Sequence, residues 1–148
     1  MVTPLLPAHM RDVTVTRQGK QVLGPVDLTL GQSGFTILLG PNGAGKTTFL
    51  KALHGLERLS TGSVTWSAPD DVARMKQAYV FQSPVMLRRS VRANLGYPLA
   101  ILGQPKAQVN DAVEAWATRI GLTAALDRPA TGLSGGEKQK LALARALI

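Results

Sequence analysis

The stretch from Gly40 to Thr48, GPNGAGKTT, constrains the fold of this chain more than any other feature. It fits the pattern G-x-x-x-x-G-K-[ST], and its flanks have the sequence that this pattern requires. The apolar, partly β-branched run at 35–39 predicts a buried strand before it. After it, Phe49, Leu50 and Leu53 recur with helical spacing. The sequence therefore predicts a strand, a glycine-rich loop and a helix in succession, as in an α/β fold.

The residue types in this loop suit the binding of a phosphate chain. Glycines let the backbone curl closely around an anion, because no Cβ intervenes and a positive φ costs little. The loop leads into a helix N-terminus, whose free N–H groups attract negative charge. Lys46 can place its ammonium on the β- and γ-phosphates, and the Thr47 hydroxyl can ligate Mg²⁺. A chance match is expected on the order of once per hundred chains of this length, so we interpret the loop as a nucleotide-binding site.

Composition and charge limit the other classes of function. The chain has 148 residues, of which 45% are hydrophobic and 18% charged, as in a globular domain. No apolar run approaches the length of a membrane span, and residues 1–7 do not resemble a signal peptide. The absence of cysteine excludes disulfides and agrees with a cytosolic protein. The net charge of +8 allows a nucleic acid, anionic lipid or acidic partner, or an acidic remainder outside this chain.

The hydrophobic period changes along the chain and predicts the order of its elements. Alternation predicts strands in the first half, and near-helical spacing predicts helices from about Ser90 onward. Gly55 is placed to end the helix that follows the loop, near His54. Beyond the strand at 35–39, the predicted strands are 12–16, 26–30, 63–67 and 79–81, and the predicted helices are 90–102, 107–120, a short piece at 122–126 and a last helix from Ser134 onward, with a loop at 129–132.

A second glycine motif, LSGGE at 133–137, begins the last helix. Ser134 is a good N-cap, and Glu137 stands three residues on, as in a capping box. Gly135 and Gly136 would leave the open N–H groups of the helix uncovered by side chains, which suits a second anion site. Alone, the stretch fits an ordinary serine cap equally well.

Together with the loop at 40–48, the segment from Leu133 to Arg145 resembles the LSGGQ signature of ATP-binding cassette (ABC) ATPases, with Glu137 where glutamine is commoner. Gln82, after the predicted strand at 79–81, is similar to the Q-loop glutamine of that family. The resemblance extends from Val13 to Ile148. It implies a P-loop NTPase core of the ABC type with an N-terminal antiparallel β part and an α-helical subdomain. The implied divisions of an ABC ATPase domain at 1–148 are a β-rich part at 10–82, a helical subdomain at about 83–132 and a signature helix at 133–148.

The resemblance also implies a mechanism in which two cassettes pair head to tail over ATP and Mg²⁺. Gln82 would sense Mg²⁺ and the γ-phosphate, and Thr48 would hold the α-phosphate. Ser134, Gly135 and Gly136 of one cassette would close over nucleotide bound to the other. The implied nucleotide-binding loop residues are Gly40, Pro41, Asn42, Gly43, Ala44, Gly45, Lys46, Thr47 and Thr48, and the implied Mg²⁺ ligands are Thr47 and Gln82.

The sequence departs from the family pattern in two places. Arg17 stands where the family usually has an aromatic residue against adenine. Its guanidinium could stack on the base, or it could be a solvated charge at a strand end. The chain ends at Ile148, before the Walker B aspartate, the catalytic glutamate and the switch histidine of the family. We therefore expect a domain truncated before the Walker B strand, with exposed apolar surface and little or no ATP hydrolysis by this chain alone.

The function that the resemblance implies is that of the ATPase subunit of an ABC transporter, at the cytoplasmic face of the membrane. Its partners would be a second cassette, integral membrane subunits and a solute-binding protein. Arg88, Arg89 and Arg92 lie where the family contacts the membrane subunits, or they are a solvated helix start. The segment at 81–91 is similar to importers of oxyanions such as tungstate or molybdate. The alternatives are a soluble ABC ATPase acting on nucleic acid or ribosomes, a less favoured class that the basic charge allows, and a nucleotide-binding remnant without turnover.

Overall fold

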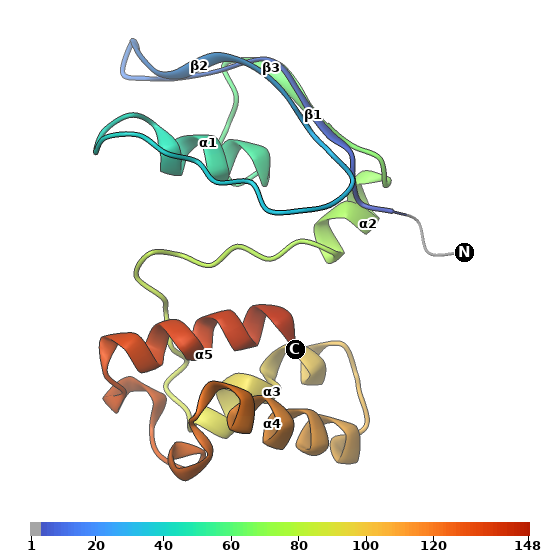
Figure 1. The fold of residues 1–148 in the computed structure, drawn as a ribbon, viewed down its shortest axis with the longest axis vertical. Helices are drawn as coiled ribbons and strands as arrows, with labels where there is room; N and C mark the ends of the chain where they lie inside the picture. Colours follow the sequence, from blue (N-terminus) through green and yellow to red (C-terminus); the bar gives the residue numbers. More distant parts are fainter. Residues whose placement is uncertain (1–3) are drawn as a thin grey trace. The chain divides into compact units, whose positions relative to one another are not determined.

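The computed structural model describes residues 4–148, which form two compact units divided between Gln77 and Ala78. The first unit contains a β-sheet with two helices, and the second is helical (Figure 1).

The sheet of the first unit is antiparallel, with the order β2-β1-β3. Its strands are β1 (Ala8–Arg17), β2 (Lys20–Leu30) and β3 (Thr61–Trp66). Arg17 of β1 pairs with Lys20 of β2 across a two-residue turn. The turn residues Gln18 and Gly19 have φ of 51° and 75°, and two positive values are typical of the tight hairpin turn whose twist matches its strands. The predicted antiparallel β part is therefore confirmed, with longer strands than the alternation indicated.

Helix α1 (Lys46–Leu53) packs on this sheet and closes the core of the first unit. Met10, Val13 and Val15 of β1 are at most 2% exposed and lie in one cluster with Ala52 and Leu53 of α1. Gly55, at φ 68°, follows the helix end in the left-handed conformation, as the sequence predicted. A second helix, α2 (Asp70–Met75), was not predicted; its six residues are too few to show a clear period.

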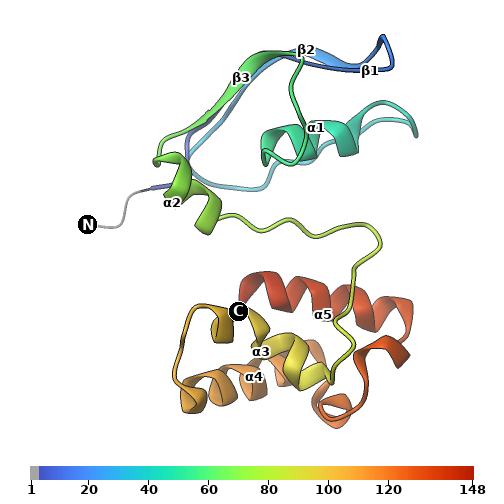
Figure 2. The same cartoon turned by 180° about the vertical axis from the view of Figure 1, so that it is seen from behind.

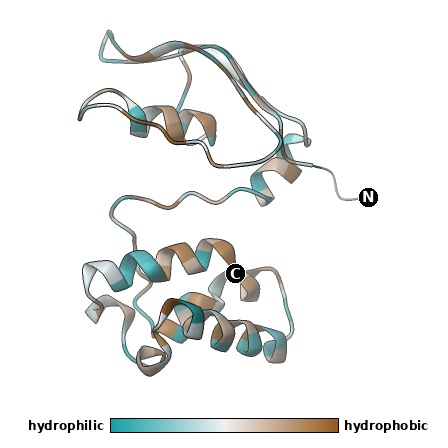
Figure 3. Cartoon of the chain, viewed as in Figure 1, coloured by the Kyte–Doolittle hydropathy of each residue, from teal (hydrophilic) through white to brown (hydrophobic). Residues whose placement is uncertain are grey.

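The predicted strands at 35–39 and 79–81 are wrong for this structure. Both stretches lack helix and strand hydrogen bonding, and their apolar side chains face solvent. Phe35 is 102% exposed, Leu39 84% and Phe81 50%. The residues have the right composition, but a strand also needs a hydrogen-bonded neighbour, and no described strand pairs with either stretch. Figure 3 shows hydrophobic colour along the extended stretch that leads into α1.

Three helices form the second unit: α3 (Val91–Ile101), α4 (Lys106–Ile120) and α5 (Gly135–Leu147), with α5 packed on the other two (Figures 1 and 2). Val91, Leu95, Val113, Ala117 and Leu141 are at most 1% exposed and form their shared core. The predicted piece at 122–126 is the 3₁₀ turn η1 (Thr123–Ala125), and the predicted loop at 129–132 contains a second turn, η2 (Ala130–Gly132).

Local capping signals explain where these helices begin and end. The Ser90 hydroxyl accepts a hydrogen bond from the Ala93 amide at 3.2 Å, which caps α3 as predicted. Gly121, at φ 71°, ends α4. Within residues 4–148, no helix has the length and apolarity that a membrane crossing requires.

Candidate functional site

The loop at 40–48 curls around the side chain of Lys46. Its Nζ donates to the carbonyl oxygens of Gly40 and Pro41, both at 2.7 Å. Gly43 and Gly45 have φ of 85° and 84°, so the backbone turns twice through the left-handed region that glycine adopts at little cost. The loop therefore holds an ammonium group at its own carbonyls, directly before α1.

The start of α1 presents backbone donors beside this ammonium group. The Phe49 amide donates to the Gly45 carbonyl at 2.8 Å and is the first donor of the helical ladder. The amides of Lys46, Thr47 and Thr48 precede it and have no intrahelical acceptor. The first turn carries no acidic residue, so nothing in it repels an anion. Thr47 is exposed in this turn, and one hydroxyl suits Mg²⁺, which usually takes few protein ligands beside substrate phosphates.

Gly45 is required by the packing of the loop as well as by its backbone angle. A Cβ on Gly45 would lie 2.9 Å from the carbonyl oxygen of Val22 in β2. Strand β2 thus presses against the turn into α1, and only glycine fits at this contact. The antiparallel sheet therefore holds the candidate phosphate-binding loop in place.

Arg17 makes a contact that sequence reasoning did not foresee. Its guanidinium forms an ion pair with Glu57, which lies 40 positions later. The Glu57 side chain is 16% exposed and that of Arg17 is 53% exposed, so about half of the arginine remains open to solvent. The pair ties the end of β1 to the segment after α1. The stacking of Arg17 on adenine stays a prediction.

The second glycine motif forms the predicted capping box at the start of α5. The Ser134 hydroxyl accepts from the Glu137 amide at 3.3 Å, and the Glu137 carboxylate accepts from the Ser134 amide at 2.8 Å. Hydrogen bonds from the Ser134 side chain and backbone lower the pKa of Glu137. A Cβ on Gly135 or Gly136 would meet nothing within 4 Å. The fold of this unit therefore does not require either glycine, and the surface over the helix start is open.

The arginines after Gln82 differ in their surroundings. Gln82 lies exposed on the extended stretch that precedes α3. Arg92 donates to Glu114 at 2.6 Å and to Asp127 at 3.2 Å, and the hydrogen bond to Glu114 contributes most to raising its pKa. Arg92 thus links α3 to α4 and to the residues after η1. Arg88 and Arg89 are exposed at a hollow of about 520 Å³ beside Pro129 and Thr131.

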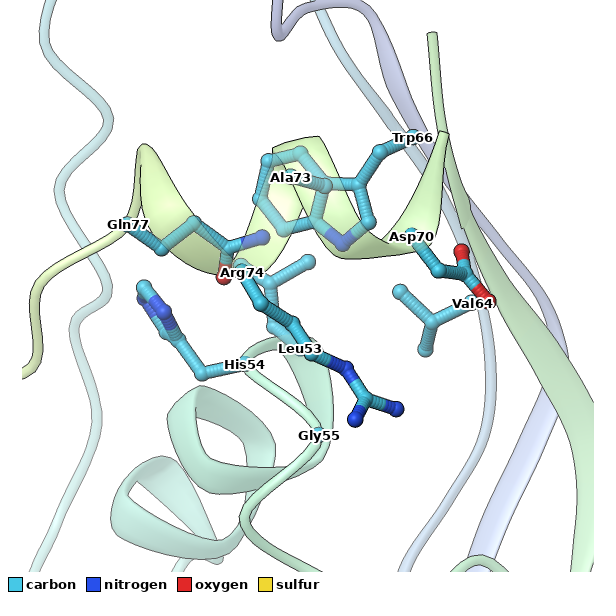
Figure 4. A pocket seen from close by; sticks show the side chains of 9 residues that line it. All are labelled: Leu53, His54, Gly55, Val64, Trp66, Asp70, Ala73, Arg74 and Gln77. Carbon is cyan, nitrogen blue, oxygen red and sulfur yellow. The ribbon is translucent and has the colours of Figure 1, made fainter. Parts of the chain in front are cut away.

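A small pocket of about 110 Å³ lies in the first unit, between the end of α1, β3 and α2 (Figure 4). Trp66 and Leu53 supply its apolar wall, and the Arg74 side chain extends across it. His54 lines the same pocket, and burial lowers its pKa, against a smaller raising effect of a hydrogen bond with Gln77. Sequence reasoning gave no role to these residues.

The structure groups the predicted site residues by unit. Arg17 and the loop at 40–48 belong to the first unit, and Gln82 with Ser134, Gly135 and Gly136 belongs to the second. Sequence reasoning missed Asn94, a poor helix former between the buried residues Val91 and Leu95 of α3. A polar residue on the apolar face of a predicted helix was the signal that could have found it.

The chain is similar in sequence to ATP-binding proteins of import systems. The chain is 37% identical over 145 residues to the Fe(3+) ions import ATP-binding protein FbpC of Photorhabdus laumondii, over 95% of the chain and 41% of that protein. It is 38% identical over 131 residues to the tungstate uptake system ATP-binding protein TupC of Peptoclostridium acidaminophilum, over 87% of the chain and 61% of that protein. The chain therefore spans less than two thirds of the length of these relatives.

The fold agrees with solved structures as well. A structure described as the ATP binding subunit of an ABC transporter superposes with a TM-score of 0.82 over 95% of this chain and 61% of that one, at 22% identity. A second, cbiO1 from Clostridium perfringens, gives a TM-score of 0.79 over 97% of this chain and 61% of that one, at 21% identity. The model of the ABC transporter family matches residues 23–148, so this chain belongs to that family.

Proposed function

We propose that this chain binds Mg-ATP at the loop of residues 40–48, as part of an ABC ATPase that drives import through separate membrane subunits. The observation that carries the proposal is the pairing of the Lys46 ammonium with the open N-terminus of α1. A cation beside free backbone N–H groups is suited to a polyphosphate. The relatives named as import or uptake proteins support import as the direction of transport.

Each residue of the loop has a distinct part in this proposal. Lys46 leaves the Gly40 and Pro41 carbonyls and binds the β- and γ-phosphates, while Thr48 holds the α-phosphate. Thr47 and Gln82 would hold Mg²⁺. The metal, when bound, supplies positive charge against the phosphate oxygens. The chain itself binds and orients the nucleotide.

The proposal includes a second cassette, paired head to tail, that supplies Ser134, Gly135 and Gly136 to the nucleotide. The open space over both glycines supports it, because their lack of a Cβ serves no packing within the unit. A partner's phosphate could approach the start of α5 closely there. Arg17 stacks on adenine through the exposed part of its guanidinium in this arrangement, while Glu57 holds its other side.

In this proposal the assembled cassettes hydrolyse ATP at the cytoplasmic face of the membrane and thereby drive transport. Arg88 and Arg89, exposed at one hollow, are proposed to meet the membrane subunits. A solute-binding protein would deliver the cargo. The segment at 81–91 and the tungstate uptake relative support a small anion as the transported cargo. The relative FbpC is named for the import of iron(III) ions instead. These import relatives do not favour the alternative of nucleic acid.

Mg-ATP titration by calorimetry tests the nucleotide site. Lys46→Ala is expected to weaken binding roughly 10- to 100-fold, the effect of losing charge-assisted hydrogen bonds. Lys51→Ala is the matched control, because it removes a lysine from the other end of α1. In a Trp116→Phe background, the Trp66 fluorescence of each variant reports whether the first unit remains folded. Equal affinities for Lys46→Ala and Lys51→Ala would contradict the proposed site.

The cargo is tested separately in the transporter purified with its membrane subunits and solute-binding protein. Tungstate or molybdate is expected to stimulate ATP turnover when added with the solute-binding protein. Stimulation by iron(III), with none by either oxyanion, would refute the proposal that the cargo is a small anion. The proposal that the loop at 40–48 binds Mg-ATP would not be affected by that result.

A further inference from the structure

Asn94 stands out in the second unit as a polar side chain inside the apolar core. It is 0% exposed and is the one buried polar residue found among residues 4–148. Its Oδ1 accepts from the Leu87 amide at 3.0 Å, and its Nδ2 donates to the carbonyls of Leu87, Arg89 and Ser90 at 3.2, 3.3 and 3.0 Å. A buried amide is tolerated when its groups are satisfied in this way. Asn94 therefore fixes the backbone that precedes α3.

Arg145 reaches the same backbone from α5. Its Nη1 donates to Asn94 Oδ1 at 3.3 Å, and its Nη2 donates to the Val85 carbonyl at 2.9 Å. Asn94 and Arg145 are 51 positions apart in the chain. The guanidinium fork thus binds a side chain of α3 and the extended stretch at once, which the single ammonium of a lysine would not reproduce.

The residues held in this way have no regular structure of their own. Residues 85–89 form neither helix nor strand. A further tie is the Ala130 amide, which donates to the Arg89 carbonyl at 2.9 Å. The stretch follows Gln82, and α5 begins at the capping box of Ser134. The Asn94–Arg145 pair therefore joins the two parts of this unit for which we have proposed nucleotide contacts.

We propose that Asn94 and Arg145 are positioning residues, a clamp that makes the stretch at 85–90 and the helix α5 move as one body. The functional part of this inference rests on the proposed function. A force applied to Arg88 and Arg89 by a membrane subunit would pass through the clamp to α5 and its Ser134 end. The coupling between the membrane subunits and the closure of the cassettes over nucleotide then depends on Asn94 and Arg145. Neither side chain contacts the membrane subunits or the nucleotide in this proposal.

Hydrogen–deuterium exchange of the 148-residue chain tests the clamp without any assumption about function. Arg145→Met is expected to speed exchange in the peptide over 83–90 roughly 10-fold or more, because it removes two charge-assisted hydrogen bonds, one to Asn94 and one to the Val85 carbonyl. Exchange over 106–120 in α4 should not change. Arg119→Met is the matched control, since Arg119 lies on α4 and stacks on Trp116 at 4.9 Å. Unchanged exchange at 83–90, or equal acceleration throughout the unit, would overturn the clamp.

The transporter purified with its membrane subunits tests the coupling. Arg145→Met is expected to reduce the stimulation of ATP turnover by the membrane subunits roughly fivefold or more, with the KM for ATP unchanged. Full stimulation in this variant would overturn the coupling role. If Arg145→Met does not fold, Arg145→Lys replaces it, because lysine keeps the charge and serves one acceptor. If the parent chain fails to bind ATP, the proposed function fails, and the exchange result still decides the clamp.

Discussion

Replacing Gly45 by alanine should destabilise the first unit more than the same change at Gly43. The two glycines have nearly the same backbone angle, φ 84° and 85°. They differ in their surroundings, because a Cβ on Gly45 would lie 2.9 Å from the Val22 carbonyl oxygen, and a Cβ on Gly43 would meet nothing within 4 Å. Gly43→Ala is therefore a control for the backbone cost alone.

The magnitudes follow from these two contributions. An alanine in the left-handed region costs about 1–2 kcal/mol, and this applies to both variants. A contact that forces backbone to shift costs a further 1–3 kcal/mol, roughly, and this applies to Gly45 only. We expect Gly45→Ala to lower the free energy of unfolding of the first unit by about 3 kcal/mol and Gly43→Ala by about 1 kcal/mol.

Urea unfolding followed by tryptophan fluorescence can measure this difference. The chain has two tryptophans, Trp66 in β3 and Trp116 in α4, one in each unit. In a Trp116→Phe background, Trp66 reports the first unit alone. If Gly45→Ala and Gly43→Ala lose the same stability, to within about 0.5 kcal/mol, the contact with Val22 does not hold the loop, and the reasoning is refuted.

The remaining predictions concern the capping box and pH. Ser134→Ala should lower the stability of the second unit by about 1 kcal/mol, measured by urea unfolding through Trp116 fluorescence in a Trp66→Phe background; no loss would contradict the capping role. Because the pKa of Glu137 is lowered in the folded chain, its ionised carboxylate stabilises the second unit at pH values above 4.5, the ordinary pKa. This stabilisation is lost as the pH falls from 4.5 through the lower pKa of the folded chain. Glu137→Gln should flatten this pH dependence of the free energy of unfolding. Because the pKa of His54 is lowered in the folded chain, this histidine is protonated at a higher pH in the unfolded chain than in the folded one. Protonation therefore favours unfolding, and the first unit should lose stability as the pH falls below 6.5. His54→Asn should reduce that loss, as followed through Trp66; an unchanged slope would refute the assignment to His54.

Sequence signals predicted those elements whose cause is local. Ser90 and Ser134 cap helices through atoms three residues away, and Gly55 ends α1 through its own backbone angle. The order of β1, β2, β3, the loop and helices α1, α3, α4 and α5 followed from periodicity. The phosphate-binding character of the loop stays a prediction, and it too rests on local chemistry, because each residue would contribute through its own side chain or backbone.

The features that sequence reasoning missed depend on partners far along the chain. Arg17 and Glu57 are 40 positions apart, and Asn94 and Arg145 are 51 apart, so no local pattern joins them. The wrong strand predictions at 35–39 and 79–81 have the same origin. Apolar composition marks a segment that can be a strand, but only hydrogen bonds to a neighbouring strand make it one.

The central claim is that this chain binds the phosphates of ATP at the N-terminus of α1. Backbone amide chemical shifts of the ¹⁵N-labelled chain, recorded with and without Mg-ATP, test it most directly. The account predicts that the largest changes fall on the amides of residues 43–48, while those of α4 stay in place. Saturating Mg-ATP that leaves the amides of residues 43–48 unshifted would contradict it.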